Sequence, residues 1–293
     1  MAVKNSSILR MPRVLFIYLQ AFSHTGGIEK FNRSFLKALY ELSIDERIDA
    51  DAYSLYDSSC NYLYFSENRF RGFAAKKLWF VLQTIFHALK YDVLIVGHIN
   101  LAVVGLIVKK IKPSIKVVTI VHGIDIWDEQ QGLKKKFMKE VDCFLAVSSF
   151  TKSKMLENNS YLIADKIKVF PNTIDPYFNL PNNFEKPEYL LQRYDVKPNE
   201  KIILTVTRLA STEKYKGYDH IFRVLKSINT KTNFKVRYFL AGKADALEAK
   251  RIDELIKQND VAEYVQLLGF IKDEELIDHY LLADVFAMPS KKE

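Results

Sequence analysis

The sequence predicts an α/β protein made of two doubly wound, Rossmann-like domains. Short apolar runs alternate with helical stretches along almost the whole chain. Most of these runs are continuous, which is typical of strands buried on both faces of a parallel sheet. One polar, proline-rich segment interrupts the pattern and divides it into two halves. Strand, helix and strand repeated in this way indicate parallel sheets joined by crossover helices.

The elements are expected in the following order. The strands of the first half are apolar runs at residues 14–19, 48–52, 93–96, 117–121, 143–147 and 168–170. Those of the second half lie at residues 202–207, 236–240, 265–267 and 285–288. The helical stretches between them are residues 28–42, 76–89, 101–111, 151–158, 218–228, 245–257 and 273–282.

The interruption sets the domain boundaries. Residues 176–201 contain four prolines and many polar residues, which favours a linker with one short helix. We expect a first domain at residues 1–177, a linker at 178–200 and a second domain at 201–293. Two such domains facing each other leave a cleft at the carboxyl ends of their strands, where ligands of this architecture usually bind.

Charge and cysteine content narrow the function class. The net charge is +8, which favours an anionic partner such as nucleic acid, an anionic membrane surface or a phosphorylated ligand. Abundant lysine on solvated faces is the alternative. Cys60 and Cys143 belong to no CxxC pair or His/Cys cluster, so we expect no disulfide framework, no metal site and a cytoplasmic protein. No apolar run reaches the roughly 18 residues of a membrane span.

The first stretch with candidate binding residues follows the first strand. Gly26 and Gly27 let the backbone come close to a ligand, and they precede a helix whose N-terminus offers unpaired N–H groups. This arrangement favours a phosphate site, with a purely structural turn as the alternative.

The second candidate is His122. It directly follows a buried strand and precedes Gly123, so it lies at the carboxyl end of the sheet. We take the other five histidines as structural or exposed.

The third candidate combines two cations. Arg208 follows the strand at 202–207, and Lys216 opens the next helix. A guanidinium fork and a compact ammonium can converge on one anion and suit a diphosphate leaving group without a metal. The alternative is two solvated bases on a loop, which is our interpretation of Lys214.

Taken together, these motifs resemble those of the retaining glycosyltransferases with the two-domain GT-B fold, specifically family 4. The resemblance spans the chain from about Val14 to its end. The matching residues are Gly26-Gly27-Ile28-Glu29, His122-Gly123, Pro171-Asn172-Thr173-Ile174-Asp175, Arg208 with Lys216, Ala241-Gly242, Gly269-Phe270, Ala283-Asp284, Pro289-Ser290 and Glu293.

The resemblance implies roles for these residues. His122 would contact the transferred sugar, Arg208 and Lys216 would neutralise the departing diphosphate, and Glu293 would contact the donor sugar's hydroxyls. Together these are the expected catalytic residues. The expected donor-binding residues are Gly26, Gly27, Gly242, Phe270 and Ile271.

The resemblance also implies the reaction. A nucleotide diphosphate sugar serves as donor substrate, no cofactor takes part, and a glycan or lipid-linked acceptor attacks from the front face, with retention, in envelope polysaccharide or glycolipid synthesis. Asp49-Ala50-Asp51 looks like the metal motif of another glycosyltransferase class, but we interpret it as solvated charge at a strand end.

Residues 70–91 mix Arg71, Lys76, Lys77 and Lys90 with Trp79 and several phenylalanines. Such a stretch can seat a protein on anionic lipid. Most of its apolar residues are nevertheless expected to cover the sheet.

The resemblance further implies that the second domain is incomplete. Family members continue past Glu293 with a second glutamate, further strands and helices. We therefore expect weak or no activity of this polypeptide, and an exposed strand edge at residues 285–288.

Other function classes remain open at this point. The serious alternative is a non-catalytic nucleotide-sugar-binding or partner subunit of the same fold. A nicotinamide oxidoreductase would need a complete glycine fingerprint and an acid for the ribose. A nucleic-acid binder would need a basic face with interleaved aromatic residues, and we expect no nucleic-acid partner.

Overall fold

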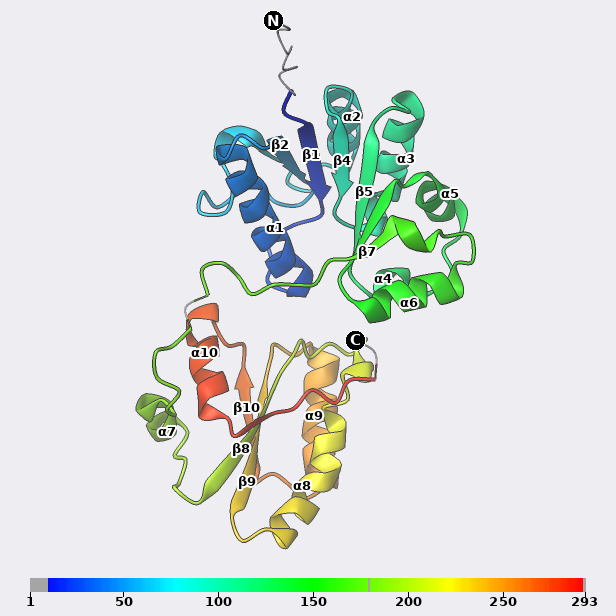
Figure 1. Cartoon of the computed structure of the whole chain (residues 1–293). Coiled ribbons are helices and arrows are strands. Elements are labelled where there is room, and N and C mark those ends of the chain that lie inside the picture. The colour runs from blue at the N-terminus through cyan, green and yellow to red at the C-terminus, as the bar shows by residue number, and fades with distance from the viewer. Residues whose placement is uncertain (1–9, 179, 292–293) are drawn as a thin grey trace, which may run out of the picture. The chain divides into compact units, whose positions relative to one another are not determined.

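The computed structural model describes residues 10–178 and 180–291 (Figure 1). The chain divides into two compact units, Met1–Phe178 and Asn179–Glu293. Each is a parallel sheet with helices on both faces. The α/β class with doubly wound parallel sheets is confirmed.

The first unit contains a seven-stranded sheet with the order β3-β2-β1-β4-β5-β6-β7. All neighbouring strands are parallel. Their bounds are Arg13–Tyr18 for β1, Asp49–Ser54 for β2, Phe70–Gly72 for β3, Val93–Val96 for β4, Lys116–Val121 for β5, Cys143–Ala146 for β6 and Ile167–Val169 for β7. The chain direction across the sheet reverses between β1 and β4, and this switch point is where ligands of such sheets bind.

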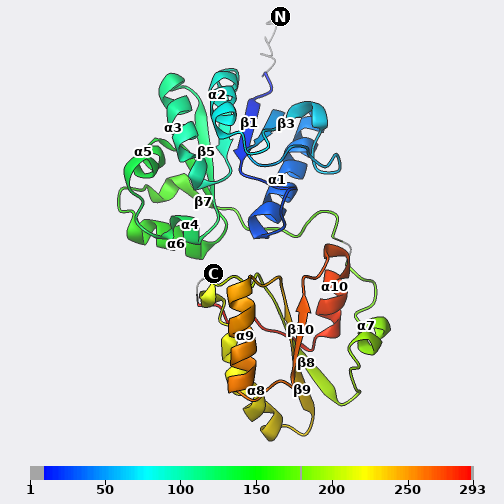
Figure 2. The ribbon, with the colours of Figure 1, turned by 180° about the vertical axis from the view of Figure 1, so that it is seen from behind.

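Helices cover both faces of this sheet. One face is packed by α1 (Gly27–Ile44) through Phe31, Leu36 and Leu39. The other face is packed by five helices. These are α2 (Lys77–Ala88), α3 (Ala102–Ile111), α4 (Ile124–Trp127), α5 (Gly132–Glu140) and α6 (Ser149–Asn158). Figure 2 shows α2, α3 and α5 from the other side.

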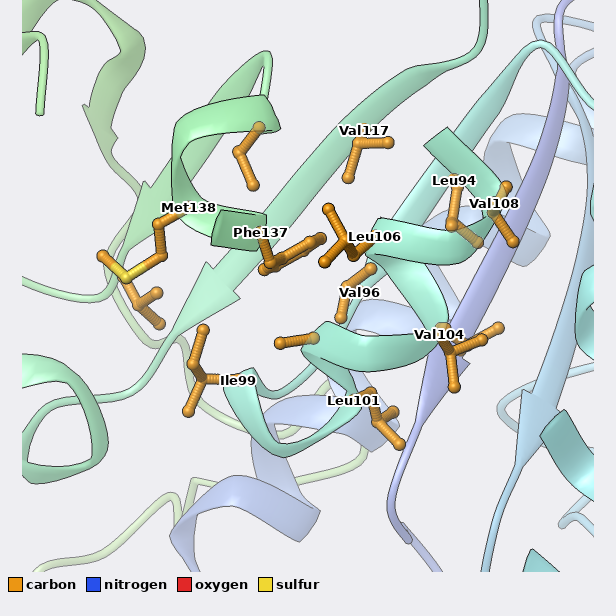
Figure 3. Close-up of a cluster of buried hydrophobic side chains, with 14 of the residues drawn as sticks. Leu94, Val96, Ile99, Leu101, Val104, Leu106, Val108, Val117, Phe137 and Met138 are labelled. Atoms are coloured by element: carbon orange, nitrogen blue, oxygen red, sulfur yellow. The ribbon is translucent and has the colours of Figure 1, made fainter. Parts of the chain in front are cut away.

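The core between α3, α5 and the sheet is tightly packed. Figure 3 shows Phe137 of α5 and Leu106 of α3 within one buried apolar cluster with Val96 and Val117 of the sheet. Gly105 makes the helix contact possible, because a Cβ at that position would lie 2.4 Å from the ring of Phe137. Such close packing fixes the strand ends that carry the candidate site.

The second unit has a four-stranded parallel sheet with the order β10-β9-β8-β11. The strands are β8 (Glu200–Val206), β9 (Lys235–Ala241), β10 (Val265–Gly269) and β11 (Val285–Phe286). One face is covered by α8 (Asp219–Lys231) and α9 (Ala246–Gln258), and the other by α7 (Glu188–Arg193) and α10 (Asp273–Leu282). In this part of the chain β11 is an edge strand, and both of its side chains are about half exposed.

The structure adds elements that the sequence pattern did not predict. The stretch at 70–91 begins with the short strand β3 before α2. Between the strands expected at residues 117–121 and 143–147, where no helix was predicted, the structure has α4 and α5. Within the segment expected as linker, Leu190 of α7 is fully buried in the core of the second unit.

Candidate functional site

The candidate residues of the first unit gather at the carboxyl ends of β1, β4 and β5. These strands are neighbours in the sheet. The loop after β1 leads to Gly26 and Gly27, Gly97-His98 follows β4, and His122 follows β5. The parallel fold therefore brings three separate segments to the switch-point edge of one sheet.

The glycine loop ends at the N-terminus of α1. Gly26 is the N-cap residue, in an extended conformation with φ −166° that any residue can adopt, and no side chain caps the helix. A Cβ on Gly27 would meet nothing within 4 Å. The fold itself thus does not require glycine at position 27, and open space lies before the N–H groups of a long helix.

Asp57 holds the start of this loop in place. Its buried carboxylate accepts hydrogen bonds from the backbone N–H groups of Ala21, Phe22 and Ser23, at 2.8, 3.1 and 2.8 Å. The hydroxyl of Ser54 also donates to it at 2.8 Å. Asp57 was not predicted as a site residue, because a carboxylate in a loop after a strand has no distinctive sequence pattern. Its side chain nevertheless positions the loop that leads to Gly26 and Gly27.

His122 is fixed by a backbone carbonyl. Its Nε2 lies 2.9 Å from the carbonyl oxygen of Gly97, which can only accept, so Nε2 carries the proton and donates. Burial lowers the pKa of His122. The hydrogen bond to Gly97 and the negative charge of Glu29 raise it, but their effect is smaller than that of burial. The ring is therefore neutral near pH 7, with the lone pair on Nδ1 available to accept a hydrogen bond.

His98 is a neighbour that the sequence interpretation treated as ordinary. Its ring stacks on that of His122 with centroids 6.1 Å apart, and its Nδ1 accepts from the N–H of Asn100 at 3.1 Å. Burial, with His122 and Lys134 nearby, lowers the pKa of His98 to about 4. Its position in the sequence could have indicated a site residue. Gly97-His98 follows the buried strand β4, just as His122-Gly123 follows the buried strand β5.

Asp125 lies three residues after His122, in the first turn of the short helix α4. Burial raises the pKa of its carboxyl to about 6, although backbone N–H groups at residues 122, 123 and 125 favour the charged form. Its Oδ2 is buried and has no hydrogen-bond partner among the residues described. The rim of the site thus carries a carboxyl that is protonated in part under mildly acidic conditions.

In the second unit, Arg208 lies just after β8 and is engaged by an acid. Its guanidinium contacts the carboxylate of Glu213 in the same loop, and its side chain is 75% exposed. Glu213 is only 13% exposed, and its second oxygen is buried without a partner in the described part of the chain. Glu213 was not predicted and orients the candidate phosphate-binding arginine.

Lys216 lies in the same loop, in a short 3₁₀ helix, with its Nζ 5.5 Å from the centroid of the Tyr215 ring. The loop is tied to the segment after β11, because the N–H of Lys291 donates to the carbonyl of Tyr215 at 2.8 Å. Gly217 has φ +71°, and a Cβ there would lie 2.0 Å from the Pro289 carbonyl oxygen. Convergence of Arg208 and Lys216 on one anion stays a prediction, and Glu293 lies outside the described residues.

A hollow of about 280 Å³ lies next to this loop in the second unit. Leu209, Gly242 and Phe270 are among its lining residues. Gly242 has φ +150°, and a Cβ there would lie 1.9 Å from the carbonyl oxygen of Thr207, so the close approach of the two strand ends requires glycine. Phe270 is 63% exposed, whereas Ile271 packs against the α7 and α10 core. Only the backbone of Ile271 is thus a candidate to border a ligand.

The Asp49-Ala50-Asp51 triplet lies within β2, and its acids are engaged by cations and a hydroxyl. Arg69 contacts both carboxylates, and Arg13 lies 3.4 Å from that of Asp49. The hydroxyl of Tyr91 donates to Asp51. The expectation of solvated charge is wrong in this respect: these acids form a partly buried ion-pair network.

Across residues 10–178 and 180–291, no helix is long and apolar enough to span a membrane.

Two Rossmann-like units with these strand-end motifs define a protein of the GT-B class. The family model described as "Glycosyltransferase Family 4" matches residues 25–178, and that described as "Glycosyl transferases group 1" matches residues 189–293. The chain belongs to the family 4 glycosyltransferases.

One curated relative is an uncharacterized glycosyltransferase of Methanocaldococcus jannaschii, MJ1607. It is 32% identical over 127 residues, which cover 43% of this chain and 31% of that protein. The match thus spans about a third of the relative's length.

Solved structures share the fold. HepE of Anabaena, in complex with UDP, has a TM-score of 0.66 at 18% identity, over 95% of this chain and 74% of that one. A glycosyltransferase of Rickettsia africae has a TM-score of 0.65 at 18% identity, over 96% and 73%. Sucrose-phosphate synthase of Thermosynechococcus elongatus has a TM-score of 0.65 at 15% identity, over 96% and 76%.

Proposed function

We propose that this protein is a retaining glycosyltransferase that uses a nucleotide diphosphate sugar and needs no metal or other cofactor. The acceptor is a glycan or a lipid-linked sugar of envelope polysaccharide or glycolipid synthesis. The enzyme works in the cytoplasm, with peripheral contact to an anionic membrane. Family membership supports the transferase class, and the complexes of HepE with UDP and with UDP-glucose support the donor class.

The observation that carries the proposal is the loop after β8. It presents the exposed guanidinium of Arg208 at the carboxyl edge of the second sheet, and the next residue, Leu209, lines the hollow together with Gly242 and Phe270. A hollow with one aromatic wall suits a nucleotide base, and a guanidinium at its edge suits the attached phosphates. Lys216, in the same loop, would add a second positive charge.

These groups explain the chemistry without a covalent sugar intermediate. The bond between the anomeric carbon and the β-phosphate oxygen breaks, and the acceptor hydroxyl forms the new bond on the same face of the sugar. Negative charge develops on the departing diphosphate, where Arg208 and Lys216 stabilise it. The acceptor proton passes to the departing phosphate oxygen.

His122 would contribute to sugar recognition. With Nε2–H donated to Gly97, its Nδ1 can accept a hydrogen bond from a sugar hydroxyl. The lowered pKa keeps the imidazole neutral, so it adds no positive charge beside the oxocarbenium-like sugar.

Isothermal titration of the full chain with UDP, GDP and ADP tests the donor site. We expect one of the three nucleotides to bind, and Arg208→Ala to weaken its binding by roughly 10- to 100-fold, as loss of a charge-assisted contact does. The matched control is Lys214→Ala, an exposed lysine of the same loop, which should leave Kd unchanged.

Nucleoside diphosphate release from a panel of nucleotide sugars then separates two outcomes. Turnover supports the transferase. Binding without turnover, with any acceptor tried, favours the non-catalytic nucleotide-sugar-binding or partner subunit. If none of the three nucleotides binds, the donor assignment is refuted.

A further inference from the structure

The solvent-facing side of α2 carries a stripe of apolar side chains that begins at Leu78. Phe80, Thr84 and Ala88 point into the core of the first unit. Four exposed side chains of α2 and that of Leu89, just after it, are large and apolar, with exposed fractions from 40% to 74%: Leu78, Trp79, Leu82, Phe86 and Leu89. At 3.6 residues per turn they form one stripe about 100° wide and roughly 16 Å long. A surface helix of a water-soluble protein usually carries polar side chains on this face.

This stripe adds detail to an expectation from the sequence. Most of the apolar residues in the segment 70–91 were expected to cover the sheet; Phe73, Phe80 and Ala88 are buried in the core, whereas the five residues of the stripe are exposed. The helix is apolar on two sides, one of which faces the core while the other is left uncovered by the described chain. A contiguous exposed apolar surface of this kind marks an interaction site.

The charge around the stripe indicates what covers it. Residues 70–124 contain one acidic residue, Asp92, and eight basic residues. The basic residues are Arg71, Lys76, Lys77, Lys90, Lys109, Lys110, Lys112 and Lys116. Lys76 and Lys77 lie at the start of α2 and Lys90 just after its end, and all three are exposed. The apolar stripe is thus flanked by positive charge at both ends.

The neighbouring helix extends the same character. α2 packs beside α3, as Figures 1 and 2 both show. On α3, Val103 and Ile111 are exposed by 42% and 54%, and Lys110 is exposed. Exposed apolar and basic side chains are therefore present on both helices.

We propose that the α2 stripe, with Lys76, Lys77 and Lys90, is a docking surface for an anionic lipid bilayer, on which α2 lies in the plane of the interface. The apolar side chains enter the boundary between headgroups and acyl chains, and the lysines contact lipid phosphates. A tryptophan such as Trp79 is favoured at this depth. A second copy of the chain suits the surface less well, because pairing through this face would bring two strongly basic segments together.

The inference refines the membrane contact within the proposed function, and it is tested without donor or acceptor. The full chain is floated with vesicles of phosphatidylcholine, with and without phosphatidylglycerol. We expect binding to the anionic vesicles that falls as salt rises from 50 to 500 mM. The double variant Leu82→Ser/Phe86→Ser should lower the partition coefficient by at least about tenfold. The matched control Leu247→Ser, at an exposed leucine of α9, should leave it unchanged.

The charge contribution has its own variant. Lys76→Glu/Lys77→Glu/Lys90→Glu should lower partitioning onto anionic vesicles roughly 100-fold or more at low salt, with little effect on neutral vesicles. Circular dichroism of each variant checks that the fold is kept.

Trp79 reports insertion directly and without disturbing the stripe. The chain has two tryptophans, so Trp127→Phe leaves Trp79 as the sole emitter. We expect its emission to shift to shorter wavelength with anionic vesicles and to be quenched by brominated lipid.

Three results would each overturn the proposal. They are absence of vesicle binding, equal binding of the parent chain and the Leu82/Phe86 variant, and a soluble dimer that this variant abolishes. These results are independent of nucleotide binding and turnover, so they do not test the transferase assignment.

Discussion

The imidazole rings of His98 and His122 lie stacked, with centroids 6.1 Å apart and an angle of 28° between their planes. They come from the ends of two adjacent strands, β4 and β5, and the carbonyl of Gly97 beside His98 accepts the hydrogen bond from His122. Burial lowers the pKa of both rings, and the neighbouring His122 further disfavours a positive charge on His98. The pair is therefore neutral near pH 7, and its titration can be followed through folding stability.

The first prediction concerns His98, whose pKa is lowered to about 4 in the folded state. The unfolded chain binds this proton near pH 6.5, so the folded state loses stability as the pH falls from 6.5 to 4. In His98→Gln the decrease in unfolding free energy over this pH range should be smaller by about 3 kcal/mol. This is the free energy that corresponds to a pKa difference of roughly 2.5 between the folded and unfolded states. Urea unfolding followed by tryptophan emission measures it, because both tryptophans lie in the first unit. A pH dependence identical to that of the parent chain would contradict the prediction.

The second prediction concerns Asp125 and has the opposite sign. Its pKa is raised to about 6, so the folded state holds the proton more tightly than the unfolded state. The resulting stability is present below about pH 4 and is lost as the pH rises through 6. Asp125→Asn should therefore gain stability relative to the parent chain between pH 4 and 7, by up to about 3 kcal/mol. The same urea titrations at each pH test this, and a constant difference between variant and parent would show that Asp125 does not titrate as described.

The two pKa shifts nearly cancel in the parent chain over this pH window. Neither could be predicted from sequence, because both depend on which strand ends meet. The sequence did predict the position of His122, since a histidine directly after a buried strand must lie at the carboxyl edge of a parallel sheet. It also predicted β4 at 93–96, where the apolar run is bounded by Asp92 and Gly97.

The limits of the sequence-based prediction have physical causes. Asp57 stabilises the glycine loop by accepting hydrogen bonds from backbone N–H groups. Nearly every residue type has such a group, so the partners of Asp57 cannot be recognised from the sequence. The sequence did not show which apolar residues of α2 face solvent, because apolar residues lie on more than one side of this helix. Gly242 was expected to bind the donor, and the structure adds a packing requirement that spacing alone does not show.

A third prediction follows from the contact of Glu213 with Arg208. Glu213→Gln keeps an oxygen that can accept from the guanidinium but removes the negative charge that competes with a diphosphate. We expect the nucleoside diphosphate Kd to tighten about fivefold at low salt, and less at high salt where charges are screened. Isothermal titration at two salt concentrations measures it. Weaker binding in this variant would mean that Glu213 serves mainly to hold the arginine in place.

The fourth prediction is that Asp57 stabilises the first unit. Asp57→Ala removes the acceptor of three backbone N–H groups, of which that of Ala21 is buried and those of Phe22 and Ser23 are partly exposed. A buried donor left unsatisfied costs about 1–3 kcal/mol, whereas water can replace the acceptor of a partly exposed donor. We expect the tryptophan-detected unfolding midpoint in urea to fall, with a loss of about 1–3 kcal/mol. Asp165→Ala, at an exposed aspartate of the same unit, is the control and should change stability by less than about 0.5 kcal/mol. Equal midpoints for the two variants would show that the loop does not depend on Asp57.

The last prediction separates a glycine kept for folding from a glycine kept for binding. Gly242→Ala places a methyl group 1.9 Å from the Thr207 carbonyl at φ +150°, so the second unit should lose more than about 2 kcal/mol of stability. Gly27→Ala adds a methyl group that meets nothing within 4 Å, at the first position of α1, where alanine is the better helix former. The stability of the Gly27→Ala variant should therefore be unchanged or slightly raised. Its affinity for the nucleoside diphosphate should fall, because the methyl group occupies the space before the helix N-terminus. Thermal unfolding by circular dichroism, paired with isothermal titration, measures both effects on the same samples. Unimpaired binding by a stable Gly27→Ala variant would remove the glycine loop from the donor site, and a fully stable Gly242→Ala variant would refute the packing role of Gly242.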